Sequence, residues 1–201
     1  MFKIIILDIE QLLPKTKNIY SVFKEITRFK SSAKKLEELI KKDYENLITN
    51  NLREDAFWNK LKDATKSKRI TNSLKTDFFT KLKPAISGEV IGRIRENFKI
   101  AVIGDFLEMW WREVKRKNRL TADYELFSSN TKLPLNNYAF FEHLQKYFNI
   151  SIQECAFVSD NTKSIMTAKM IGSEIVFISN KKIPEANFTY PSLNSFVDVL
   201  T

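Results

Sequence analysis

The sequence predicts an α/β protein: a three-layer, Rossmann-like parallel sheet with an all-helical segment inserted after its first strand. Short continuous apolar runs alternate with amphipathic segments of helical spacing, which is the pattern of strands covered by helices on both faces. The alternation is interrupted after Pro14, because only helical spacing occurs from about residue 17 to 83. We therefore expect a core formed by residues 1–13 and 96–201, and a helical cap formed by residues 14–95.

The first predicted strand is the apolar run of residues 2–7, which ends at Asp8 and suits a buried parallel strand. Asp8 and Glu10 interrupt this run too early for a signal peptide or a membrane span. Cys155 is the single cysteine and forms no internal disulfide, and His143 alone offers no Cys/His metal cluster. We therefore expect a cytoplasmic, soluble protein.

Four amphipathic helices are expected in the cap. Ser31 or Ser32 is placed to cap the second helix, and Asn51 with Glu54 three residues later resembles a capping box for the third. Pro84 closes the helical section. The four apolar stripes are Ile19, Val22, Phe23 and Ile26; Leu36, Leu39, Ile40, Tyr44 and Leu47; Phe57, Trp58 and Leu61; and Leu74, Phe78, Phe79 and Leu82.

After the cap the chain returns to alternating strands and helices, which predicts a parallel sheet covered on both faces. Gly172 follows one of these helices and suits its C-terminal end, because glycine tolerates positive φ. The predicted strands are 99–103, 124–127, 155–158 and 175–178, and the predicted helices are 107–119, 138–148, 162–171 and 192–200.

The net charge of +9 is concentrated in the cap. Residues 14–95 contain 20 Lys/Arg against 10 Asp/Glu, a net of +10, whereas the remainder contains 13 against 14. A basic segment attracts phosphorylated substrates, nucleic acid or anionic membrane surfaces. A solvated face of lysine-rich helices explains the same charge equally well.

Acidic residues follow three of the predicted strands. Asp8 and Glu10 follow the first strand, Asp105 follows the second, and Asp160 follows the strand 155–158. Because ligands of open parallel sheets bind where the strands end, these side chains are expected at one edge of the sheet. Carboxylates brought together repel each other unless a cation neutralises them, and Mg²⁺ is the usual oxygen-liganded cation.

Four segments resemble the motifs of the haloacid dehalogenase-like (HAD) hydrolases, in the order in which that family has them. The tail beyond Phe188 is similar to the family's last strand and helix, and residues 14–95 stand where the family inserts a helical cap. The likeness therefore covers the whole chain. The four segments are Leu7–Leu13, Ile100–Asp105, Lys132–Tyr138 and Glu154–Asn161.

The resemblance implies a Mg²⁺-dependent phosphoester hydrolase. Asp8 would be the nucleophile and form an aspartyl-phosphate that water then hydrolyses. Asp8 and Asp160, with the backbone carbonyl of Glu10, would hold Mg²⁺. Glu10 would protonate the leaving group and later activate water, and Lys132 would neutralise developing charge.

Several positions depart from the family motifs. Glu10 replaces an aspartate, and its extra methylene moves the carboxyl by roughly an ångström, a displacement that costs about 10²-fold in rate. Gly104, which with Asp105 forms the expected substrate-binding position, replaces a Ser or Thr; losing such a donor costs ~10²–10³ in turnover. Gln11 replaces a turn glycine, and Ser159 replaces one residue of an acidic pair.

These departures leave rival functions open. One is a catalytically degenerate HAD-fold protein that binds an anionic partner such as nucleic acid through the basic cap. Another is dehalogenase-type chemistry, which uses the same nucleophile without a metal. A phosphorylated small molecule is the favoured ligand, and a membrane partner is not expected.

A second pattern concerns nucleic acid. Trp110 and Trp111 precede a run of cations that ends at Arg119, and interleaved aromatic and basic residues bind single strands. A helix with one buried tryptophan and a solvated basic side has the same pattern, and this interpretation is favoured.

Overall fold

A computed structural model describes residues 2–13, 19–82, 84 and 86–200. Its centre is one sheet of parallel strands in the order β3-β2-β1-β4-β5-β6, so that β1 lies between β2 and β4. This confirms the predicted Rossmann-like class. The strands are β1 (Ile4–Asp8), β2 (Lys99–Gly104), β3 (Tyr124–Phe127), β4 (Cys155–Ser159), β5 (Glu174–Ile178) and β6 (Phe188–Tyr190).

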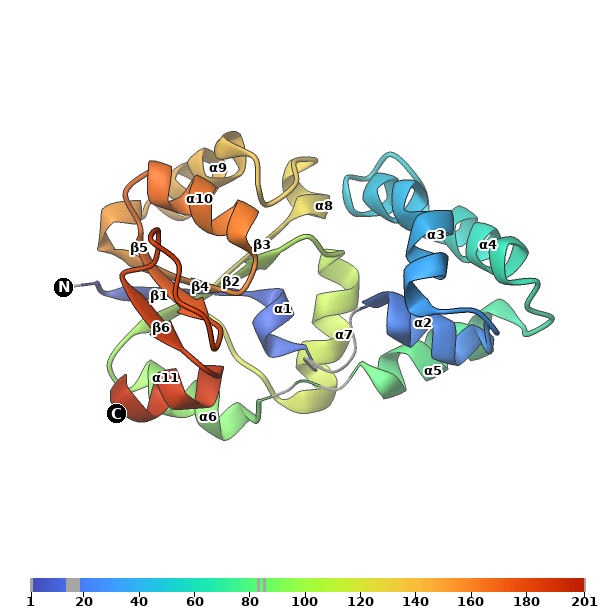
Figure 1. The fold of residues 1–201 in the computed structure, drawn as a ribbon, viewed down its shortest axis with the longest axis horizontal. Coiled ribbons are helices and arrows are strands. Elements are labelled where there is room, and N and C mark those ends of the chain that lie inside the picture. Colours follow the sequence, from blue (N-terminus) through green and yellow to red (C-terminus); the bar gives the residue numbers. More distant parts are fainter. Residues whose placement is uncertain (1, 14–18, 83, 85, 201) are drawn as a thin grey trace.

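Helices cover both faces of the sheet and complete three layers (Figure 1). α9 (Tyr138–Phe148) and α10 (Thr162–Met170) pack on one face, where Ile6, Ile103 and Phe157 point. The other face is covered by three helices, which are α6 (Gly88–Arg95), α7 (Glu108–Asn118) and α11 (Leu193–Leu200). Side chains alternate between these two apolar layers, so the strands read as continuous apolar runs.

Three short helical segments lie at the ends of strands. The carboxylate of Asp8 caps α1 (Ile9–Leu12), so the chain turns into this helix directly from β1. α8 (Ser128–Thr131) directly follows β3, and a 3-10 turn (Ile152–Glu154) directly precedes β4.

Between β1 and β2 lies the all-helical cap, which extends to the right in Figure 1. Its helices are α2 (Ile19–Thr27), α3 (Ala33–Ile48), α4 (Glu54–Thr65) and α5 (Thr71–Lys81). Ser32 caps α3 by accepting a hydrogen bond from the backbone N–H of Lys35 (3.1 Å). This confirms one of the two predicted capping residues, Ser31 or Ser32. Within the predicted cap of residues 14–95, positions 14–18, 83 and 85 lie outside the described residues.

Two local predictions in the cap were wrong. Asn51 does not cap α4: its amide donates to the hydroxyl of Thr49 (3.0 Å), and Arg53 precedes the helix without a side-chain cap. Asp55 and Glu54 supply negative charge in the first turn instead. Leu39 is 49% exposed, because the buried stripe of α3 runs through positions on either side of it.

The helix α6 was not predicted as a separate element. Ser87 caps it by accepting from the N–H of Val90 (3.4 Å), and Ile91 and Ile94 are buried. Two glycines in eight residues obscured its periodicity. Although residues 14–95 were taken together as the cap, α6 packs against β2 and α11 of the sheet layer (Figure 1).

The cap and the sheet layer share one continuous hydrophobic cluster. Trp110 of α7 is its bridge: its ring centroid lies 4.7 Å from that of Phe78 and 5.8 Å from that of Trp58. The indole N–H groups of Trp58 and Trp110 both donate to Oε1 of Glu54, at 2.9 and 3.0 Å.

Both tryptophans of α7 are buried, Trp110 at 1% and Trp111 at 0% exposure, where one had been expected. Trp111 packs against Phe127, with their ring centroids 6.0 Å apart. Neither ring is therefore available for stacking with a base. The basic side of the helix forms ion pairs, which are Arg112 with Glu108, Lys115 with Glu125, and Arg116 and Lys117 with Glu113.

Every helix within the described ranges is too short or too polar to span a bilayer.

Candidate active site

The centre of the candidate site is Asp8, the last residue of the central strand β1. The register pairs Leu7 with Val158, so Asp8 comes to lie beside Ser159 at the end of β4. The hydroxyl of Ser159 donates to Oδ2 of Asp8 at 2.7 Å, and the backbone N–H of Glu10 donates to Oδ1 at 3.1 Å. With both oxygens held and 1% exposure, the Asp8 carboxylate has one defined orientation.

A second carboxylate is positioned by the neighbouring strands. Gly104 pairs with Phe127, so Asp105 after β2 lies beside Ser128 after β3. The Ser128 hydroxyl and the backbone N–H of Leu135 (2.7 Å) both donate to Oδ1 of Asp105. Ser128 was missed by the sequence analysis, although it directly follows a predicted strand, as the other candidates do.

A third carboxylate, Asp160, directly follows β4 and is exposed. Its Oδ1 accepts a hydrogen bond of 2.6 Å from Nε2 of Gln11, which is 1% exposed in α1. This contact ties the turn after β1 to the turn after β4. Gln11 entered the sequence analysis as a replaced glycine, and nothing in the sequence indicated its contact with Asp160.

Burial and neighbouring acidic charges raise the pKa of two carboxyl groups at this edge, Asp8 and Glu10. Burial raises the pKa of Asp8 well above its ordinary value, repulsion from Glu10 adds to this, and the Ser159 hydrogen bond opposes it. Glu10 keeps solvent-exposed surface, yet burial, then Asp160, then Asp105 raise its pKa to about 7. Burial also raises the pKa of Asp105. Within the described residues no Lys or Arg forms an ion pair with any of the four carboxylates.

Lys132 is not brought into contact with this cluster. It is exposed and follows α8 in a left-handed conformation (φ 61°). Its backbone N–H donates to Ser128 (2.8 Å), but its ammonium makes no hydrogen bond or ion pair with the part of the chain that the structure describes. The structure thus brings together Asp8, Glu10 and the acids after β2 and β4, without the predicted lysine.

The position of Gly104 explains why no hydroxyl side chain stands there. It ends β2 beside the start of α1, and a Cβ added to Gly104 would lie 2.4 Å from Cγ2 of Ile9 and 3.4 Å from Oδ1 of Asp8. Its φ of +155° is also one that L-residues rarely adopt. The Ile9 side chain therefore occupies the space that a Ser or Thr would need.

The cap reaches the site through two hydrogen bonds, one to the loop after β2 and one to helix α8 after β3. The buried hydroxyl of Tyr44 donates to the backbone carbonyl of Asp105 (3.2 Å), and the amide of Asn50 donates to that of Ser129 (2.6 Å). Burial, with Tyr20 nearby, raises the pKa of Tyr44 above its ordinary value, so the hydroxyl stays a donor. Tyr44 lies in an apolar helix stripe, which concealed this role in the sequence.

The carboxylates at this edge could bind a cation such as Mg²⁺ that takes only a few of its ligands from the protein. No group of three or more His, Cys, Asp or Glu side chains converges on one point among the residues described. Mg²⁺ is usually bound by one or two carboxylates together with waters and substrate phosphate, so a dedicated cage is not required. Asp8 and Asp160 supply two carboxylates at the ends of neighbouring strands, and Glu10 is repelled by the charge of Asp160, which a cation at this edge would relieve.

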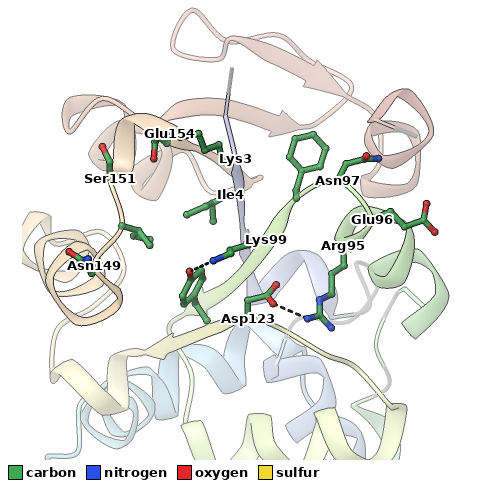
Figure 2. A pocket seen from close by; sticks show the side chains of 13 residues that line it. Lys3, Ile4, Arg95, Glu96, Asn97, Lys99, Asp123, Asn149, Ser151 and Glu154 are labelled. Carbon is green, nitrogen blue, oxygen red and sulfur yellow. Dashed lines mark hydrogen bonds and ion pairs between the residues drawn. The ribbon is translucent and has the colours of Figure 1, made fainter.

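A cavity of about 500 Å³ lies at the opposite, amino-terminal edge of the sheet (Figure 2). We do not place the site there, because ligands of open parallel sheets bind at the carboxyl ends of the strands and because all three Lys and Arg side chains that line this cavity are already paired. The pairs are Lys3 with Glu154, Arg95 with Asp123 (2.8 Å), and Lys99 with the hydroxyl of Tyr124 (3.3 Å).

No protein-family model matches the sequence, and no curated protein matches it. Solved structures of similar fold do exist. An L-2-haloacid dehalogenase is 11% identical, with a TM-score of 0.76 over 100% of both chains. The L-2-haloacid dehalogenase from Xanthobacter autotrophicus with chloropropionic acid covalently bound is 12% identical, with a TM-score of 0.71 over 100% of this chain and 98% of that chain.

A HAD-family enzyme from Bacteroides thetaiotaomicron, in complex with magnesium and inorganic phosphate, is also similar. It is 12% identical, with a TM-score of 0.71 over 92% of this chain and 98% of that chain. At these identities the likeness establishes the architecture. The chain therefore has the HAD-like fold, as its motifs predicted, with the helical cap included in the match.

Proposed function

We propose that the chain is a HAD-like hydrolase that cleaves the phosphoester of a small phosphorylated molecule, with Asp8 as its nucleophile. The observation that carries this proposal is the setting of the Asp8 carboxylate. It ends the central strand and is held by the Ser159 hydroxyl (2.7 Å) and the Glu10 N–H (3.1 Å). It also lies near other carboxylates: the charges of Glu10 and Asp105 raise its pKa, and no Lys or Arg in the described ranges forms an ion pair with it.

We further propose Mg²⁺ as the cofactor, held by Asp8, Asp160 and the backbone carbonyl of Glu10. When bound, the ion would screen the attacking carboxylate from the anionic phosphoryl group. The repulsion between carboxylates supports this, because a cation stabilises their charged forms. The magnesium and phosphate in the similar Bacteroides thetaiotaomicron enzyme support it as well.

The reaction follows from the roles of two side chains. An oxygen of Asp8 attacks phosphorus and forms an aspartyl-phosphate, while the departing alkoxide takes a proton from Glu10. Glu10, now a carboxylate, removes a proton from water, and that water attacks phosphorus and releases phosphate from Asp8. A pKa of about 7 suits Glu10 to both transfers, because an acid–base catalyst works best near its own pKa.

Two further residues keep their predicted roles as proposals. Lys132 would neutralise charge on the phosphoryl group, which requires its exposed side chain to turn toward Asp8 when substrate binds. Gly104 and Asp105 would contact the substrate through the loop after β2. The basic cap would raise the local concentration of an anionic substrate.

The test is phosphate release from an aryl phosphate with and without millimolar Mg²⁺. We expect Asp8→Asn to abolish Mg²⁺-dependent release, because an amide cannot act as the nucleophile. Asp63→Asn, a change of the same kind at an exposed position of α4, should leave the rate unchanged. An inactive parent protein across a broad panel of phosphorylated compounds would refute the proposal. A salt-dependent gel shift of nucleic acid by that inactive protein would favour the binding alternative.

Dehalogenation is the second candidate function, favoured by the hydrogen bonds of Asp8. Both of its oxygens accept from uncharged donors, so its orientation does not depend on a metal. Two of the similar structures are L-2-haloacid dehalogenases, one of them with chloropropionic acid covalently bound. Chloride release from 2-chloropropionate without Mg²⁺ would identify this chemistry, and its absence would leave the phosphoester proposal.

A further inference from the structure

The buried amide of Gln11 is the polar group at this edge of the sheet whose presence packing does not explain. Gln11 lies in α1 between Ile9 and Leu12, which are buried at 1% exposure as it is. An apolar side chain would fill the same space without a polar group to satisfy. The glutamine must therefore contribute through its amide.

The nitrogen of this amide has a hydrogen-bond partner, and the oxygen has none among the described residues. Nε2 donates to Oδ1 of Asp160 at 2.6 Å, whereas Oε1 is buried without a hydrogen-bond partner among the described residues. Leaving a buried acceptor unpaired is unfavourable. The reverse orientation would set two oxygens 2.6 Å apart, so the amide is held as a donor to Asp160.

The contact fixes one oxygen of Asp160 and leaves the other free. Oδ2 of Asp160 makes no hydrogen bond with the chain in the ranges that the structure covers, and the residue is exposed. The partner of Gln11 thus has a set orientation and an open oxygen on the same edge as Asp8. Side chains that hold a metal-binding carboxylate in this way commonly change metal affinity by 10–100-fold when removed.

We propose that Gln11 is a positioning residue for the cation site, which orients Asp160 so that its free oxygen and the Asp8 carboxylate bind one Mg²⁺. The inference rests on the proposed function, because it requires the cation. Gln11 itself does not touch substrate or metal; it acts through Asp160.

The test is a calorimetric titration of the whole protein with MgCl₂, together with its Tm in the absence of metal. Gln11→Met keeps the length of the side chain and removes the donor. We expect Mg²⁺ affinity to fall by about 10–100-fold. The metal-free Tm should stay the same or rise, since the unpaired Oε1 is also removed.

Two variants complete the experiment. Gln153→Met makes the same change at a glutamine whose amide donates to Ile171 (3.3 Å), away from the site, and should leave affinity unchanged. Gln11→Asn keeps a polar residue but withdraws the donor by one methylene, so it should lose affinity as Gln11→Met does, and it serves if the methionine variant does not fold.

Three results would overturn the inference. Unchanged Mg²⁺ affinity in both Gln11 variants would show that the contact with Asp160 is structural and would leave the proposed function intact. An equal loss of affinity in Gln153→Met would show a non-specific effect. Absence of Mg²⁺ binding by the parent protein would refute the proposed cofactor, and the role of Gln11 with it.

Discussion

Glu10 carries its carboxyl one methylene farther from the backbone than an aspartate would, in a crowded group of acids. The backbone N–H of Glu10 is used to hold Asp8, while burial and the charges of Asp160 and Asp105 raise the pKa of its side chain to about 7. In the proposed mechanism, Glu10 would therefore both orient the nucleophile through its backbone and supply a proton through its side chain.

The raised pKa of Glu10 has a consequence for the pH dependence of kcat/KM. Glu10 must be protonated to protonate the leaving group, so activity should fall as the pH rises through the pKa of Glu10, which is about 7 without a metal and is lowered when Mg²⁺ binds beside it. In Glu10→Gln this alkaline limb should disappear and the rate should fall by about 10²–10⁴-fold. A pH–rate profile of both proteins checks this. The same limb in the variant would assign it to another group.

The side chain of Ile9 leaves room only for a glycine at position 104. The expected Cβ contact of 2.4 Å with Ile9 means that Gly104→Ser should not restore a useful hydroxyl. It should lower the free energy of unfolding by about 1–3 kcal/mol, as overpacking does. Ile9→Ala in the same chain removes Cγ2 and should recover part of the loss. A urea titration in which Gly104→Ser is as stable as the parent would contradict this explanation.

At the scale of elements, two pairs of strands build the site through their register. Leu7 opposite Val158 sets Asp8 beside Ser159, and Gly104 opposite Phe127 sets Asp105 beside Ser128. The sequence could predict that acids gather at this edge, because apolar runs mark where each strand ends. It could not predict which side chains touch, since the register depends on the folded sheet.

Other residues show where sequence patterns stop being informative. Tyr44 and Gln11 make their contacts across long stretches of chain, and neither has a neighbour in sequence that indicates the partner. Lys132 matched a motif by spacing, yet its ammonium remains in solvent. Asn51 fitted a capping pattern, but α4 begins at Glu54 and Asn51 makes no capping hydrogen bond to it.

Glu54 is the element-scale link between the cap and the sheet layer. It accepts hydrogen bonds from the buried indoles of Trp58 and Trp110 and pairs with Lys75 (3.2 Å). Glu54→Ala should lower the free energy of unfolding by about 1–3 kcal/mol, because it leaves buried N–H groups without an acceptor. Urea denaturation measures the loss, with the exposed Glu38→Ala as control. Equal stability of the two variants would exclude Glu54 as an anchor.

On the scale of the whole molecule, the cap and the sheet layer unfold together in our interpretation, because one hydrophobic cluster runs through both. Phe23 of the cap packs 5.3 Å from Phe78 and 6.4 Å from Trp110. Phe23→Ala should therefore lower the stability seen by tryptophan fluorescence and by far-UV circular dichroism equally, by about 3–5 kcal/mol. Two separate transitions would show that the cap unfolds by itself.

In the proposed function, substrate would reach Asp8 only after the cap or the neighbouring loops move. Asp8 is 1% exposed, and Tyr44 links the cap to the loop after β2. The cap carries the excess positive charge, so it would attract the anionic substrate that we propose.

The most direct measurement is a crystal structure of the protein with Mg²⁺ and a phosphoryl mimic such as fluoroberyllate. The account predicts the mimic bonded to an oxygen of Asp8, with one cation shared by Asp8 and Asp160. A mimic bound away from Asp8, or a cation that does not contact both Asp8 and Asp160, would contradict it.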